Sequence, residues 1–198
     1  LALLIPKSKI TIHNCLLNKT RLGFYKVLKE KSGANIKIKK IRNSTENGEV
    51  IGTVIACSSS LKAINCPKEL IPSLIDELPI LFVIAALTKG ISKFQRINEV
   101  TKKESNRIEE MRKILFQAGI KCKSTKDSMT IFGKNNIQNK KKLIVVNTLG
   151  DHRISLSAWM FSLVTGIKTI IKDFETVNTS FPGFINLIRN LGGKIEIK

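Results

Sequence analysis

The sequence is poor in acidic residues, in aromatic residues and in closely spaced cysteines. Only 15 of its 198 residues are Asp or Glu, against 34 Lys and Arg, so the formal net charge is +19. None of the four cysteines stands in a Cys-x-x-Cys pair. This spacing excludes the usual zinc-binding and redox motifs, and it predicts free thiols in a reducing, cytoplasmic compartment.

Long apolar runs and glycine-rich phosphate loops are also missing. The longest apolar run, residues 80–87, is too short to span a bilayer, and Pro79 just before it predicts the first turn of a buried helix. No P-loop or dinucleotide-binding glycine pattern occurs, so a nucleotide cofactor is not predicted. Because 42% of the residues are hydrophobic, the chain can still form a core. We expect a soluble protein with no metal, no cofactor and no membrane partner.

The excess of positive charge has two explanations. A basic surface is the first sign of a nucleic-acid-binding protein. However, Lys, Ile and Asn are all frequent, as in the product of an AT-rich gene, and the lysines are scattered apart from short runs at 37–40 and 140–142. No RNP-like or zinc-finger pattern accompanies them. We therefore expect no nucleic-acid partner, and a basic RNA-binding α/β domain is the alternative from another functional class.

Two patterns recur three times along the chain. The first is the tail of an apolar helix, a turn and an alternating strand, and it occurs at residues 1–14, 83–97 and 161–174. The second is an amphipathic helix, a glycine and a strand, and it occurs at residues 20–39, 105–123 and 180–198. The expected N-caps of the second pattern are Thr20, Ser105 and Ser180, and the expected terminal glycines are Gly33, Gly119, and Gly192 or Gly193.

These patterns predict repeated strand–helix–strand–helix–strand units and an α/β or α+β fold. Further strands are predicted at 50–57, 61–66, 128–133 and 143–148, and a polar loop is predicted at 135–142. The second and third units have a whole helix before the strand of the first pattern, whereas the first unit opens inside its helix, at Leu1, without an N-cap. We therefore expect that a partner segment of this chain is missing.

Charged residues concentrate at the starts of three predicted helices. They are Asp76, three residues before Pro79; the stretch Lys103-Glu104-x-x-Arg107; and the triplet Asp151-His152-Arg153. Each has a plain structural explanation when it is taken alone. These explanations are a helix cap, a surface ion pair, and a cap followed by two solvated side chains.

In a threefold repeat, equivalent helix ends gather on one side of the domain. Backbone N–H groups favour anions there, and Lys103, Arg107 and Arg153 would add positive charge. Asp76 and Glu104 would then be carboxylates inside a cationic pocket, an arrangement suited to proton transfer. The pattern thus favours an enzyme that acts on phosphate- or carboxylate-bearing substrates.

Four motifs give the sequence a resemblance to a known family. IDELPIL at 75–81, KKESNRIEEM at 102–111, GDHRISLS at 150–157 and TSFPGFINLIRNLGGKIEI at 179–197 are similar, in this order, to motifs of the 5-enolpyruvylshikimate-3-phosphate (EPSP) synthase family. The similarity extends over essentially the whole chain and is most like the glyphosate-tolerant bacterial class. It implies transfer of the enolpyruvyl group of phosphoenolpyruvate to the 5-hydroxyl of shikimate 3-phosphate, with release of phosphate, on the route to aromatic amino acids.

The resemblance also implies the fold, an inverse α/β barrel of two similar domains that close on the substrates. Each domain is a pseudo-threefold repeat of βαβαββ units. Residues 1–198 would be the C-terminal domain, with units at about 1–58, 59–134 and 143–198. The partner would be the N-terminal domain of the same enzyme, and the complete enzyme would be a monomer.

Residue roles follow from the resemblance position by position. Asp76 matches the proton acceptor for the shikimate hydroxyl, and it also binds that substrate. Glu104 matches the acid that protonates the enolpyruvyl methylene. Lys103 matches a ligand of shikimate 3-phosphate.

The arginines match residues that bind phosphoenolpyruvate. Arg107 and Arg153 correspond to ligands of its carboxylate, where a planar guanidinium fork fits, and His152 matches a nearby position. Asn106 replaces the Asp that is commonest in the family, and we expect it to be structural. Thr179 stands where some members carry a phosphate-binding Lys, so no contact is assigned to it.

The nearest alternative within this fold is the sibling enzyme that adds enolpyruvate to UDP-N-acetylglucosamine. It shares the architecture and the chemistry of group transfer. The adjacent Lys103 and Glu104 and the Asp-His-Arg triplet argue against it.

Overall fold

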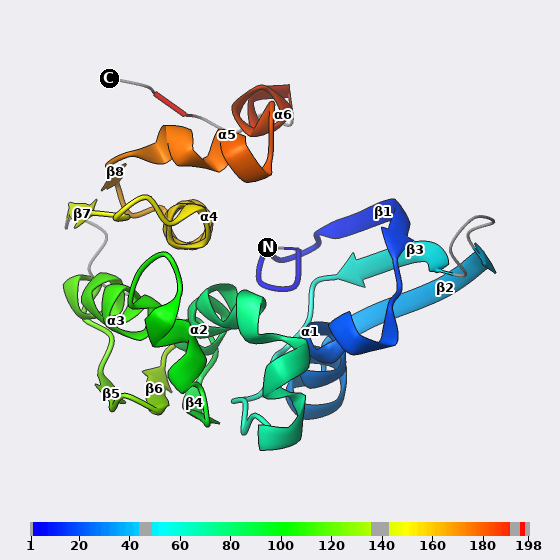
Figure 1. The fold of residues 1–198 in the computed structure, drawn as a ribbon, viewed down its shortest axis with the longest axis horizontal. Coiled ribbons are helices and arrows are strands. Elements are labelled where there is room, and N and C mark those ends of the chain that lie inside the picture. The colour runs from blue at the N-terminus through cyan, green and yellow to red at the C-terminus, as the bar shows by residue number, and fades with distance from the viewer. Residues whose placement is uncertain (1, 44–48, 136–142, 191–194, 197–198) are drawn as a thin grey trace.

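The computed structural model describes residues 2–43, 49–135, 143–190 and 195–196 (Figure 1). The strands are β1 Lys9–Leu16, β2 Asn35–Asn43, β3 Val50–Cys57, β4 Gly90–Gln95, β5 Cys122–Ser124, β6 Ser128–Gly133, β7 Ile144–Val146 and β8 Thr169–Ile171. The helices are α1 Gly23–Lys26, α2 Leu78–Ala86, α3 Arg107–Gln117, α4 His152–Thr165, α5 Val177–Ser180 and α6 Phe184–Asn190. This alternation confirms the predicted mixed α/β fold.

Two antiparallel sheets have the same internal order. The first runs β1-β3-β2 and the second β4-β6-β5, so in each sheet the last strand along the chain lies in the middle. In both cases a helical segment follows the first strand and precedes the other two. The strands predicted at 50–57 and 128–133 are confirmed, because they coincide with β3 and β6. The third sheet is the parallel pair β7-β8.

The strand predicted at 61–66 is reduced to one isolated parallel bridge, between Asn65 and Lys93 of β4. The flanking backbone bonds run from Lys93 N to Ile64 O at 2.7 Å and from Cys66 N to Lys93 O at 2.9 Å. The N–H of Ile64 is taken by the Oγ of Ser92 at 2.9 Å instead of by a backbone carbonyl. The side-chain bond therefore stops the ladder on the Ile64 side of the bridge.

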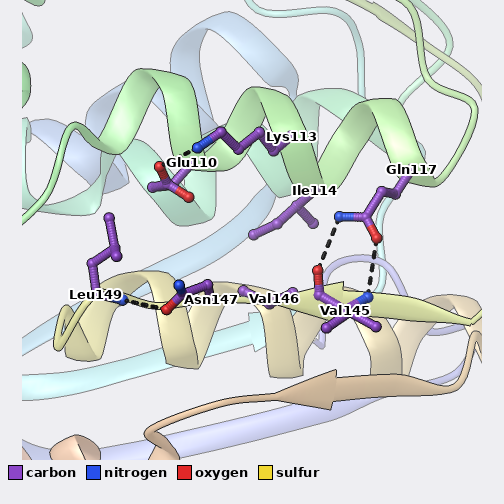
Figure 2. Close-up of a pocket in the computed structure, with 8 residues that line it drawn as sticks. All are labelled: Glu110, Lys113, Ile114, Gln117, Val145, Val146, Asn147 and Leu149. Atoms are coloured by element: carbon purple, nitrogen blue, oxygen red, sulfur yellow. Dashed lines mark hydrogen bonds and ion pairs between the residues drawn. The ribbon is translucent and has the colours of Figure 1, made fainter.

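Helix ends connect each unit to the next one. Ser32 donates its Oγ to the carbonyl of Lys62 at 2.6 Å, and the N–H of Lys62 donates back to the Ser32 carbonyl at 2.9 Å. Gln117 at the end of α3 makes the corresponding pair of bonds with the backbone of Val145 in β7, at 3.0 Å each (Figure 2). Each contact thus joins the end of a helical segment to a segment about 30 residues further along the chain.

The main core surrounds α2, which lies near the centre of the view in Figure 1, between the β1-β3-β2 sheet and the helices α3 and α4. Leu78, Leu81 and Phe82 are fully buried, and the Phe82 ring packs edge-on against Phe94 of β4 with centroids 5.0 Å apart. The helix is apolar on all sides because α3, α4 and β6 all pack against it. Pro79 lies in its first turn, as predicted.

None of the predicted N-caps, Thr20, Ser105 and Ser180, caps its helix. Asn106, not Ser105, caps α3, and its side chain accepts from the N–H of Glu109 at 3.2 Å. In the first unit Asn18 caps the 3₁₀ turn Lys19–Arg21 and accepts from the N–H of Thr20 at 2.9 Å, whereas α1 follows Leu22 without a side-chain cap. Ser180 is the last residue of α5 instead of a cap. Neighbouring Ser, Thr and Asn residues are nearly equivalent as caps, so local sequence does not separate them.

Two helices of the second pattern are shorter than predicted. The first consists of α1 and a π-helical turn, Val27–Lys31, and it ends at Gly33, whose φ of 73° fits the expected left-handed stop. The last helix, α6, begins at Phe184, and its expected terminal glycines lie outside the described residues. The loop predicted at 135–142 lies almost entirely outside them as well.

A smaller core joins the last helices. Trp159 of α4, Val177 of α5 and Phe184 of α6 are buried together, and the Trp159 and Phe184 rings meet edge-on at 5.2 Å. Across the described parts of the chain, every helix is too short or too polar to cross a membrane.

Candidate active site

The three charged helix starts meet around one carboxylate, that of Asp76. Asp76 lies in the short 3₁₀ turn Ile75–Glu77 just before α2, and its side chain is 19% exposed. Four cationic groups approach its oxygens: Arg21 Nη1 at 3.4 Å, Arg107 Nη1 at 3.5 Å, Arg153 Nη2 at 3.6 Å and Lys103 Nζ at 3.7 Å. The predicted gathering of Asp76, Lys103, Arg107 and Arg153 is therefore present.

Asp76 does not cap α2, contrary to its plain structural explanation. Glu77 occupies the cap position, and no side chain there bonds to the helix N–H groups. Burial acts to raise the pKa of Asp76, but the charges of Arg153, Lys103, Arg21 and Arg107 outweigh it, and the pKa lies below its ordinary value. Asp76 is thus an ionised carboxylate held by side-chain cations.

Arg107 is the buried centre of the site, with only 1% of its side chain exposed. Its Nε donates to Asp151 Oδ2 at 2.8 Å, its Nη2 to Glu104 Oε2 at 2.6 Å, and its Nη1 to Asp76 Oδ1 at 3.5 Å. One guanidinium therefore ties together carboxylates from all three helix starts.

Glu104 forms the predicted ion pair with Arg107, but only one partner lies at the surface. The Glu104 side chain is 49% exposed, whereas Arg107 is covered. The expectation of a surface pair is wrong for Arg107, because the contact of α3 with the start of α4 encloses its guanidinium.

The Asp151-His152-Arg153 triplet behaves partly as predicted. Asp151 caps α4, and its Oδ1 accepts from the N–H of Arg153 at 2.9 Å. Arg153 is not simply solvated, since its Nη1 donates to the backbone carbonyl of Asp76 at 3.0 Å. His152 is partly buried, and its side chain forms no hydrogen bond with any described residue. Its predicted place near the site follows only from its position at the first turn of α4.

Lys103 lies between a 3₁₀ turn, Asn98–Lys102, and α3, on extended backbone. Its side chain is 36% exposed and reaches the same Asp76 oxygen as Arg107. The alternating charges of this stretch therefore have a spatial explanation: the cations face Asp76, and Glu104 lies at the rim.

Arg21 is the site residue that sequence reasoning missed. Both of its terminal nitrogens lie 3.4 Å from Asp76 Oδ2, and Nη2 also lies 3.9 Å from Glu77. A signal was available, because Arg21 precedes α1 in the first unit as Lys103 precedes α3 in the second. Arg21 and Lys103 therefore reach Asp76 from comparable places, just before α1 and α3.

A separate small hollow lies on another side of α3 (Figure 2). It has a volume of about 160 Å³ and is lined by Glu110, Lys113, Ile114, Gln117, Val145, Val146, Asn147 and Leu149. Figure 2 shows Glu110 paired with Lys113 and Gln117 paired with Val145, so these polar groups already have partners. Within the described residues, no group of three or more His, Cys, Asp or Glu side chains is placed to hold a metal ion.

Solved structures place this fold in a class. An EPSP synthase from Acinetobacter baumannii superposes with a TM-score of 0.85 at 32% identity, over 100% of this chain and 44% of that chain. The enolpyruvyl transferase NikO from Streptomyces tendae superposes with a TM-score of 0.67 at 12% identity, over 95% of this chain and 39% of that chain, a likeness of fold alone. The chain therefore has the fold of one half of a two-domain enolpyruvyl transferase.

Sequence comparison narrows the class to a family. The family model described as EPSP synthase (3-phosphoshikimate 1-carboxyvinyltransferase) matches residues 1–188. Proteins named 3-phosphoshikimate 1-carboxyvinyltransferase from Caldicellulosiruptor bescii and Bartonella quintana are 37% and 38% identical over 98% of this chain, which covers 44% and 43% of their lengths. The chain belongs to the EPSP synthase family. It spans less than half the length of the curated relatives that it matches.

Proposed function

We propose that this chain forms one half of a 3-phosphoshikimate 1-carboxyvinyltransferase. The enzyme would transfer the enolpyruvyl group of phosphoenolpyruvate to the 5-hydroxyl of shikimate 3-phosphate and release phosphate. Membership of the EPSP synthase family supports this proposal. The structural observation that carries it is the carboxylate of Asp76 within 3.7 Å of four cationic side chains, with Glu104 at the rim.

Two carboxylates would move the protons in this reaction. Asp76 would accept the proton of the attacking hydroxyl as its oxygen bonds to the central carbon of the enolpyruvyl group. Glu104 would donate a proton to the methylene carbon, which becomes a methyl group in a tetrahedral intermediate. Loss of a proton from that methyl group and departure of phosphate would restore the double bond. The half-exposed side chain of Glu104, paired with Arg107 at the edge of the cationic cluster, supports the donor role.

The cations would hold the substrate anions. Arg107 and Arg153 would bind the carboxylate of phosphoenolpyruvate, and Lys103 would bind shikimate 3-phosphate. At present Nη2 of Arg107 holds the Glu104 carboxylate at 2.6 Å. A substrate carboxylate taking that place would release Glu104 towards the reacting carbon. Anions among these cations would also offset their charge and raise the pKa of Asp76, which would make it a better base.

The chain would work together with a complementary half, corresponding to the remainder of its relatives; we use "complete enzyme" for the protein that contains both. Both substrates must be held close and aligned for reaction. We therefore expect the chain alone to release no measurable phosphate, and addition of the complementary half to restore release. Strong turnover by the chain alone would contradict the proposal that both halves are needed to form the active site. A cytoplasmic location and a monomeric complete enzyme remain predictions.

The test is phosphate release from phosphoenolpyruvate by the complete enzyme, measured in parallel with two acceptors. Shikimate 3-phosphate should support release, and UDP-N-acetylglucosamine should not. The reverse preference would assign the chain to the sibling activity. If neither acceptor supports phosphate release and the protein retards RNA in a gel in a salt-dependent way, the RNA-binding alternative is favoured.

A further inference from the structure

Asp151 lies behind the arginines of the site and is completely buried. Its Oδ2 serves the start of α3, and its Oδ1 serves mainly the start of α4, with one longer contact from Arg107 Nη2 at 3.4 Å. Oδ2 accepts from Arg107 Nε at 2.8 Å and from Ser105 Oγ at 2.9 Å, both at the start of α3. Oδ1 accepts from the backbone N–H of Arg153 at 2.9 Å and of Ile154 at 3.4 Å, in the first turn of α4.

This arrangement joins the two arginines that the proposed function assigns to phosphoenolpyruvate. Asp151 holds Arg107 through Nε at 2.8 Å and through a longer contact from Nη2 at 3.4 Å. The terminal nitrogens still face Asp76 and Glu104. Asp151 accepts from the backbone N–H of Arg153 and so fixes the base of the side chain that donates to the Asp76 carbonyl. A shift of Asp151 would therefore move both guanidinium groups.

We propose that Asp151 is a positioning residue that sets Arg107 and Arg153 relative to one another, so that their guanidinium groups can grip one carboxylate-bearing substrate. The inference rests on the proposed function. Capping α4 does not require this arrangement, because Ser, Thr or Asn would cap as well. A carboxylate is required to accept from Arg107 and Ser105 on one oxygen while it caps α4 with the other.

Asp151 stays ionised in this environment, which the positioning role requires. Burial acts to raise its pKa, but the hydrogen bond and charge of Arg107 and the hydrogen bond of Ser105 outweigh burial and hold the pKa below its ordinary value. No buried side-chain nitrogen or oxygen in the described residues lacks a hydrogen-bond partner. The network is thus fully satisfied, and loss of one acceptor leaves a buried donor unpaired.

The Asp151→Asn substitution separates the two functions of this side chain. Asparagine keeps the size, and its oxygen can still cap α4. Its amide nitrogen would replace Oδ2, so Arg107 Nε would face another donor. In the complete enzyme we expect the KM for phosphoenolpyruvate to rise roughly 10- to 100-fold. The KM for shikimate 3-phosphate should change much less. Glu109→Gln, which breaks a pair with Arg112 on α3, is the matched control and should change neither KM.

A double-mutant cycle distinguishes positioning from support of the fold. If Asp151 acts through Arg107, Asp151→Asn should raise the KM for phosphoenolpyruvate in the wild type but add little in an Arg107→Gln background. An equal increase in both backgrounds would overturn the proposal. So would an unchanged KM with a lowered melting temperature, since that is the signature of a structural role alone.

Ser105→Ala tests the same link without leaving a buried charge unpaired. It withdraws one of the donors to Oδ2, so the KM for phosphoenolpyruvate should rise several-fold while that for shikimate 3-phosphate is kept. Equal KM changes for both substrates would overturn the proposal. Wild-type enzyme that fails to turn over these two substrates would instead refute the proposed function. Normal turnover with an unaffected Asp151→Asn variant would refute only the positioning role.

Discussion

Arg107 and Glu104 form an ion pair whose partners differ in exposure: Nη2 of Arg107 lies 2.6 Å from Oε2 of Glu104, yet Arg107 is 1% exposed and Glu104 is 49% exposed. The buried partner is held from behind by Asp151, and the exposed one faces solvent. A carboxylate-bearing substrate would replace the Glu104 carboxylate on this nitrogen. The pair thus connects substrate binding to release of the proposed acid.

Replacement of Arg107 by Lys should weaken phosphoenolpyruvate binding selectively. Lysine keeps the charge but loses the planar fork and the Nε contact to Asp151. Loss of one charge-assisted hydrogen bond costs about 1.5–3 kcal/mol, or roughly a 10- to 100-fold rise in the KM for phosphoenolpyruvate. The KM for shikimate 3-phosphate should rise less. Steady-state kinetics of the complete enzyme measure both, with Arg112→Lys on α3 as the control. Equal increases for both substrates would mean that Arg107 is only structural.

Replacement of Arg21 by Gln should shift the pH dependence of the reaction. Arg21 is among the cations that lower the pKa of Asp76, so its removal should raise that pKa. A base with a higher pKa becomes protonated at a higher pH, and the acidic limb of the kcat/KM profile should therefore move upward. Lys19→Gln is the control, because Lys19 lies on the same turn, Lys19–Arg21, and has no ion pair among the described residues. A limb that stays in place, or moves to lower pH, would remove Arg21 from the site.

Replacement of Gly133 by Ala should destabilise the fold. A Cβ at this position would overlap the backbone carbonyl oxygens of Ala85 and Thr88 at the end of α2. Such overpacking typically costs about 1–3 kcal/mol, which corresponds to several degrees in the melting temperature. Gly119→Asn is the control, because Gly119 has a φ of 74° with no atom near its Cβ position, and Asn tolerates this conformation. Thermal unfolding measures both melting temperatures. A lower melting temperature for Gly119→Asn than for Gly133→Ala would contradict the packing described for α2 and β6.

The gathering of the three helix starts was predicted from the repeat, which relates only two of them directly. The starts of α2 and α4 are equivalent because both helices lead into the first pattern, whereas α3 belongs to the second pattern. Asp76, Lys103, Arg107 and Arg153 were located by that argument, and their contacts confirm the cluster. Their catalytic and binding roles stay predictions.

Burial and cap positions could not be predicted in the same way. Ser105 and Asn106 are both good caps, and only the contact of Ser105 with Asp151, 46 residues away, leaves the cap to Asn106. The sequence of α3 alone does not indicate that Arg107 is buried. The side chains of Asp76 and Asp151, which contact it, come from other segments. Long-range contacts of this kind leave no periodic signal in the local sequence.

The central claim is that a carboxylic acid in this chain delivers the proton that starts enolpyruvyl transfer, and its most direct test is the single-turnover rate of the complete enzyme with Glu104→Gln. Glutamine keeps the size and can still accept from Arg107 Nη2, but it cannot donate as an acid. General acid catalysis is worth about 10²- to 10⁴-fold, so the rate should fall by that factor while the separately measured affinity for shikimate 3-phosphate stays nearly constant. A surface ion pair alone contributes about 0.2–0.5 kcal/mol and would leave the rate almost unchanged. A near-normal single-turnover rate in this variant would contradict the account.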